Sequence, residues 1–188
     1  MHTSRVQTRH RRHGAEERRV LVRMLEGGRA HAPLRQSLLA FPRALRGAKP
    51  RGAPHTPWEL LEHLRLAQRD ILDFSRDPEH PSPPWPEGFW PVSATPPDAR
   101  AWEKSARAFL KDLRALEAVA RTKHDLAATI PGTTTSWFGQ LCLVASHNSY
   151  HLGQLFLLRR TLESARRDPG GKRTAETGGR GGARSRSR

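Results

Sequence analysis

Apolar residues in this chain recur at intervals of three and four, and almost nowhere do they alternate with polar residues. The first spacing places side chains on one face of a helix, whereas alternation is typical of half-buried strands. A chain with this pattern has to bury its apolar residues between helices. We therefore expect an all-α protein without a sheet, built as a four-helix bundle.

Start and stop signals divide this pattern into segments. The clearest start is the run Thr56-Pro57-Trp58-Glu59, in which Thr56 can cap the free N–H groups and Glu59 can complete a capping box. Residues 95–98 repeat this capping logic. Helices are expected over residues 15–26, from 56 to about 74, from just after 98 to about 120 and from about 135 to 165, and a helical piece after Pro33 either stands alone or continues the first helix.

The stretch between the second and third of these long helices is rich in proline. Residues 76–97 hold eight of the fifteen prolines, so they can form neither a helix nor a central strand. Such long connections are uncommon in compact domains and often functional. This one carries Trp85, Phe89 and Trp90, which need apolar surface to cover. We expect either that Trp85 or Trp90 walls a ligand pocket or that the loop closes the side of the bundle.

The formal net charge of +15 is concentrated at the two ends of the chain. Both ends lack apolar periodicity, and the second is also rich in glycine, so they cannot offset the entropy of ordering. We expect a disordered basic tail at residues 1–17, one domain at 18–165 and a second disordered basic tail at 166–188. Basic tails can bind nucleic acid through phosphates. However, Arg outnumbers Lys 28 to 5, which indicates the codon bias of a GC-rich genome and makes nucleic acid the weaker alternative.

The chain carries one cysteine, Cys142, and no apolar run as long as a membrane span. A single thiol cannot form an internal disulfide framework, which favours a reducing compartment. The N-terminus lacks the apolar segment of a secretory signal. We therefore expect a cytoplasmic protein without a membrane partner, in which Cys142 is a small core residue rather than a nucleophile.

Three histidines form the strongest candidate site. His147 and His151 are four residues apart, so they share one face of the last helix, and His63 lies at the edge of the buried stripe of another helix. Neutral imidazoles bind a borderline cation without bringing charge into an apolar interior, and three of them leave one coordination position open, as in catalytic zinc sites. Zinc, nickel and iron all suit imidazole. The spacing of these histidines alone is also compatible with core residues that form structural hydrogen bonds and bind no metal.

A family resemblance bears on this choice. Residues 147–154, read as HNSYHLGQ, resemble the H-N-x-Y-H-x-G-Q signature of the DinB-like superfamily. Residues 58–64 resemble its other signature, residues 83–91 resemble the Pro-rich stretch of one branch, and the agreement spans about residues 18–163. The resemblance implies a four-helix bundle, usually dimeric, with one divalent metal ion held by three histidines. These correspond here to His63, His147 and His151.

The resemblance also implies function. The superfamily includes thiol-dependent enzymes that use bacterial thiols such as mycothiol or bacillithiol, which predicts a metalloenzyme with thiol-transferase or hydrolase-like activity on a small molecule. Asn148 and Tyr150 would then support the metal ligands or contact substrate, although helix packing explains them equally well. The alternative is a metal-binding stress protein without catalysis.

Overall fold

The computed structural model describes residues 2–28 and 30–167 of the chain. Within these ranges the chain is helical, and its only β-type pairings are two isolated bridges. The helices are α1 (His2–Glu26), α2 (Leu34–Leu39), α3 (Pro57–Arg76), α4 (Ala101–Thr122) and α5 (Trp137–Arg167), with two 3₁₀ turns, η1 (Arg43–Leu45) and η2 (Glu87–Phe89). The expected all-α class is confirmed.

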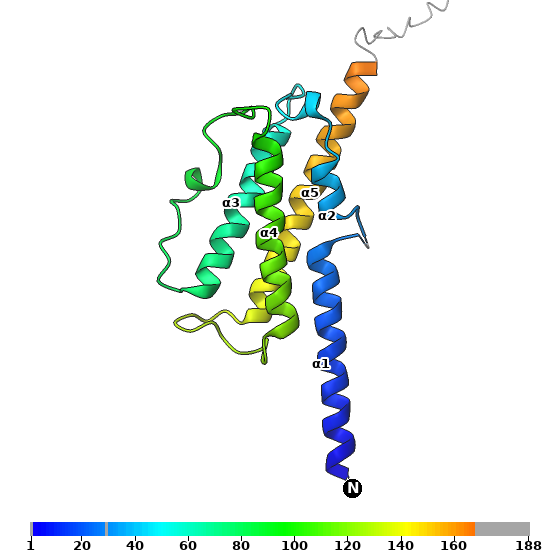
Figure 1. The fold of residues 1–188 in the computed structure, drawn as a ribbon, viewed down its shortest axis with the longest axis vertical. Coiled ribbons are helices and arrows are strands. Elements are labelled where there is room, and N and C mark those ends of the chain that lie inside the picture. Colours follow the sequence, from blue (N-terminus) through cyan, green and yellow to red (C-terminus); the bar gives the residue numbers. More distant parts are fainter. Residues whose placement is uncertain (1, 29, 168–188) are drawn as a thin grey trace, which may run out of the picture.

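Four of these helices are long and lie roughly side by side (Figure 1). Helix α3 packs against α4 and α5, and α1 packs against the same two helices. The short helix α2 contacts α4 and α5. The connection from α3 to α4 passes along the outside of the bundle and contains only the turn η2 (Figure 1). The described residues therefore form a helical bundle of four long helices and one short one.

The expected start of the first helix was wrong. Helix α1 begins at His2 rather than near Ala15, so it runs through the segment expected to be a disordered tail at residues 1–17. This segment contains no proline, and its arginines and glutamine are good helix formers, so the helix can extend without an apolar stripe. Its first turns project beyond the other helices (Figure 1). Of the second expected tail, residues 166–188, only the last two residues of α5 lie within the described part.

The first two helical pieces are separate helices. Helix α1 ends at Glu26, and Gly27 and Gly28 follow with φ values of 73° and 93°. These left-handed conformations favour glycine and end the helix. The capping expected at residues 95–98 is also corrected. Helix α4 starts only at Ala101, and Arg100 precedes it without a side-chain cap. Asp98 instead accepts a hydrogen bond from the N–H of Arg100 at 2.6 Å, which forms a turn before the helix.

The predicted capping box at the start of α3 is present. The hydroxyl of Thr56 accepts the N–H of Glu59 at 3.1 Å, and the carboxylate of Glu59 accepts the N–H of Thr56 at 2.7 Å. The same hydroxyl donates to the carbonyl of Ala94 at 2.7 Å, which joins the end of the Pro-rich connection to this helix. Because Leu60, Leu61 and Leu64 follow and are almost completely buried, the cap fixes the register in which α3 enters the core.

The core is continuous across the helices. Trp102 of α4 is 1% exposed, and its indole N–H donates to the carbonyl of Leu38 in α2 at 2.9 Å. Phe109, Leu113 and Leu116 extend the buried face of α4. Among the described residues, no helix is both long enough and apolar enough to cross a membrane.

Replacing Thr56 with alanine should lower the free energy of unfolding by about 1 kcal/mol, because the side chain both caps α3 and binds the carbonyl of Ala94. Thr56→Ser keeps the hydroxyl and should retain most of the stability. Urea denaturation of the two variants and the wild type measures the difference. A Thr56→Ala variant within about 0.3 kcal/mol of the wild type would show that the cap contributes little.

Candidate metal centre

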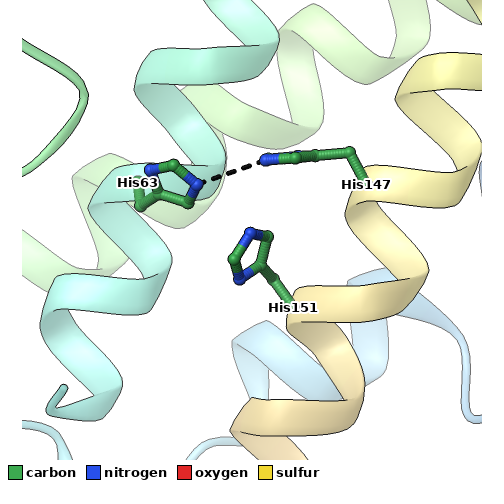
Figure 2. A group of neighbouring side chains, drawn as sticks. All are labelled: His63, His147 and His151. Atoms are coloured by element: carbon green, nitrogen blue, oxygen red, sulfur yellow. Dashed lines mark hydrogen bonds between the residues drawn. The ribbon is translucent and has the colours of Figure 1, made fainter. Parts of the chain in front are cut away.

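His63 of α3 and His147 and His151 of α5 converge in the space between the two helices (Figure 2). Each histidine offers one ring nitrogen, and these three atoms all lie within 4.8 Å of one another. The Nε2 atoms of His63 and His147 are 3.2 Å apart. The structure therefore brings together the three histidines that the sequence predicted as ligands.

Helix geometry explains this convergence. The four-residue spacing of His147 and His151 places one above the other on the face of α5 that packs against α3. His63 was expected at the edge of the buried stripe of its helix, but it is only 3% exposed, and its neighbours Leu60 and Leu64 are buried with it. The ring thus points into the space between the helices (Figure 2).

Hydrogen bonds orient two of the three rings. Nδ1 of His63 donates to the carbonyl of Phe89 at 2.9 Å, and Nδ1 of His151 donates to the amide oxygen of Gln154 at 2.8 Å. A carbonyl oxygen only accepts, so in both neutral rings the hydrogen is on Nδ1 and Nε2 keeps a free lone pair. Nδ1 of His147, by contrast, is buried without a hydrogen-bond partner among the described residues.

The surroundings keep these rings neutral. Burial, together with smaller effects of the neighbouring His151 and His63, lowers the pKa of His147 to about 4. Burial also lowers the pKa of His63 and of His151, although the hydrogen bonds to Phe89 and to Gln154 act in the opposite direction. Near neutral pH the three imidazoles are therefore unprotonated, which is the state that a metal requires.

Aromatic rings cover two of the histidines. Trp90, one of the two tryptophans expected at a pocket wall, stacks on His63 with ring centres 4.2 Å apart, and His55 stacks on Trp90 at 3.9 Å. Tyr150 is largely exposed and presents its ring to His151 at 4.8 Å. Trp85 is 74% exposed and packs against Phe89, so the structure brings Trp90 rather than Trp85 onto a histidine.

Asn148 follows His147 in α5 and is buried. It is 1% exposed, and its amide N–H donates to the side-chain oxygen of Gln68 at 2.8 Å. The amide N–H of Gln68 in turn donates to the carbonyl of Phe109 at 2.7 Å. The side-chain oxygen of Asn148 is buried without a hydrogen-bond partner among the described residues. Asn148 therefore joins α5 to α3 and, through α3, to α4.

Several groups at the centre were not predicted as site residues. Gln154 follows His151 by three residues, so helical spacing could have indicated that it binds the ring. The role of the Phe89 carbonyl could not be predicted from the sequence, because every residue has a backbone carbonyl. His55 and Gln68 likewise become visible only when the helices are packed. Cys142 is half-buried, and burial raises the pKa of its thiol, which disfavours the reactive thiolate.

The donor set suits one divalent metal ion. Three neutral imidazole nitrogens face one space, and two of the rings are held in the required tautomer. The two closest nitrogens are within hydrogen-bond distance of each other, and a cation bound to both would replace that hydrogen bond. Within the described residues, this is the one cluster of at least three histidine, cysteine or acidic side chains with such spacing. The residues present therefore fit a metal ion of the kind that imidazole binds, such as zinc, nickel or iron.

Comparison with protein families agrees with this geometry. A model of the DinB superfamily matches residues 28–155, which include α2, α3, α4 and the part of α5 that carries His147 and His151. No curated protein and no solved structure matches the chain significantly. Because the matched residues make up more than half of the sequence, the chain belongs to the DinB superfamily.

Proposed function

We propose that this protein binds one divalent metal ion through Nε2 of His63, His147 and His151 and uses it in a reaction on a small molecule. The observation that carries the proposal is the convergence of three unprotonated imidazoles, two of them oriented from outside the centre. A purely structural role would need only the hydrogen bond between Nε2 of His63 and Nε2 of His147, and it would not explain why His151 faces the same space.

Three protein ligands leave a coordination position for a further molecule. When bound there, the metal ion would lower the pKa of a thiol or of water and so supply a nucleophile at neutral pH. The most specific form of the proposal is transfer of a low-molecular-weight bacterial thiol to an electrophile. A thiol-independent hydrolysis is the less specific form.

Other residues of the chain orient the ligand rings and form a pocket beside them that could hold a substrate. Phe89 and Gln154 hold two of the ligand rings, and Trp90 covers one face of His63. A pocket of about 380 Å³ adjoins this arrangement, and its lining includes Gln154 and His55. Leu157 and Leu158 give this pocket an apolar side, as is typical of small-molecule sites.

The single cysteine bears on the cellular compartment, and exposed residues of α5 bear on the oligomeric state. We propose a cytoplasmic protein, because the chain has a single cysteine. We also propose a homodimer through α5, where Leu143, Tyr150 and Leu157 are exposed at intervals of seven residues. Such a stripe lies along one side of a helix and suits the same helix of a second copy.

The test combines metal content with turnover. The purified full chain should bind about one equivalent of zinc, and the zinc-loaded protein should accelerate the reaction of a model electrophile with mycothiol or bacillithiol relative to the metal-stripped protein. His151→Ala should lose both properties, because two imidazoles hold zinc poorly. His124→Ala removes a histidine from the connection between α4 and α5 and should behave like the wild type.

Two outcomes divide the alternatives. Stoichiometric zinc without any acceleration would favour a metal-binding protein that is not an enzyme. Equal zinc content in the wild type and His151→Ala would refute the proposed ligand set. Binding of DNA that is lost when residues 168–188 are removed would instead favour nucleic-acid binding through a basic tail.

The lowered pKa values predict how the stability of the metal-free protein depends on pH. In the unfolded chain the three imidazoles titrate near the ordinary value of 6.5, whereas in the folded chain their pKa values are lower, about 4 for His147. Below pH 6.5 the unfolded state therefore binds more protons, and stability falls as the pH decreases toward 4. Above pH 6.5 this contribution is fully retained.

Urea denaturation in the presence of a chelator, at several pH values from 7.5 to about 4.5, measures this dependence. His147→Asn removes the imidazole with the lowest of the three values and should make the loss of stability with decreasing pH shallower. Identical pH dependence in the variant and the wild type would mean that His147 is protonated as easily in the folded chain as in the unfolded one.

A further inference from the structure

Two hydrogen bonds join Asn148 of α5 to Gln68 of α3 and Gln68 to the backbone of α4, and the donor of each can be identified. The carbonyl of Phe109 can only accept, so the group of Gln68 that faces it at 2.7 Å has to be the amide nitrogen. The oxygen of Gln68 then faces Asn148 at 2.8 Å and has to accept, so the group of Asn148 that faces it is also the amide nitrogen. The backbone of α4 thereby determines the orientation of both amides.

This chain of hydrogen bonds ends at an oxygen that needs a donor. Asn148 Oδ1 is buried and has no partner within the described residues. The next residue toward the N-terminus of α5 is His147, whose Nδ1 is likewise buried without a partner. An acceptor without a donor and a ring nitrogen without a partner thus belong to neighbouring side chains.

We propose that Asn148 Oδ1 accepts the hydrogen of His147 Nδ1, so that Asn148 and Gln68 are positioning residues that fix the tautomer of this ligand. The hydrogen then sits on Nδ1 of His147, and Nε2 turns its lone pair toward the centre. This inference rests on the proposed metal binding only for its predicted effect on zinc affinity, because the tautomer itself exists in the metal-free protein.

The other two rings of the centre support this arrangement. The same pattern holds at His63, whose Nδ1 donates to the carbonyl of Phe89, and at His151, whose Nδ1 donates to Gln154. All three rings would then have Nδ1 bound outward and Nε2 free inward.

The competing arrangement places the hydrogen on Nε2 of His147. That atom would then donate to Nε2 of His63 at 3.2 Å, and the metal-free centre would be closed by a hydrogen bond. Nδ1 of His147 and Oδ1 of Asn148 would both remain buried acceptors without a donor. The position of one hydrogen atom therefore distinguishes the two arrangements.

The first measurement uses the metal-free full chain labelled with ¹⁵N. Long-range ¹H–¹⁵N correlation spectra near neutral pH assign the tautomer of each histidine ring. The proposal expects the Nδ1–H form of His147 in the wild type and a shift toward Nε2–H in Asn148→Leu. A wild-type His147 in the Nε2–H form would overturn the proposal, whether or not the protein binds metal.

The second measurement is the dissociation constant of zinc. Asn148→Leu should weaken zinc binding by about 10- to 100-fold, as loss of an outer partner of a ligand histidine does. Asn148→Asp keeps an acceptor toward His147 but loses the donor to Gln68, so it should bind zinc more tightly than Asn148→Leu while folding less stably than the wild type. Ser149→Ala, which changes a side chain that binds the carbonyl of Ala145 and His31, is the matched control and should not change the constant.

The outcomes separate this inference from the proposed function. If Asn148 only packs the helices, Asn148→Leu will lower the melting temperature and leave both the tautomer and the zinc constant of the folded protein unchanged, which refutes the positioning role. If the wild type binds no zinc, the proposed function fails, and the tautomers of the wild type and of Asn148→Leu still decide the inference.

Discussion

The mutual approach of three neutral imidazoles between α3 and α5 is the constraint on which the rest of this structure depends. Burial keeps His63, His147 and His151 unprotonated, and outward hydrogen bonds leave Nε2 of His63 and of His151 with free lone pairs. Without a metal ion, the inward nitrogens of His63 and His147 can share one hydrogen bond. A single cation can bind all three inward nitrogens at once, which one hydrogen bond between two of them cannot do.

The scaffold holds this arrangement from several directions. The capping box at Thr56 sets the register of α3, and the same hydroxyl fixes the end of the Pro-rich connection at Ala94. That connection in turn supplies the carbonyl of Phe89 and the ring of Trp90 to the centre. The long loop thus serves as part of the site, and Asn148 adds a third support from within the bundle. Metal binding is accordingly expected to depend on residues far from the ligands in sequence.

Much of this could be predicted from the sequence, for identifiable reasons. Helical periodicity, the start of α3 and the four-residue spacing of His147 and His151 are local properties, and local rules describe them well. The start of α1 at His2 was not predicted, because the first residues of the helix have helix propensity but no apolar stripe, and the prediction relied on the stripe. The carbonyl of Phe89 and the amide of Gln68 escaped prediction because their roles arise from packing between helices, which no local pattern records.

The central claim is that three imidazoles bind the metal, and X-ray absorption spectroscopy of the zinc-loaded full chain tests it most directly. The account predicts a first shell of nitrogen and oxygen atoms at about 2.0–2.1 Å with the outer-shell scattering of three imidazole rings. His63→Ala should reduce that scattering by about one ring. A sulfur atom at about 2.3 Å, or scattering from fewer than two imidazoles in the wild type, would contradict the account.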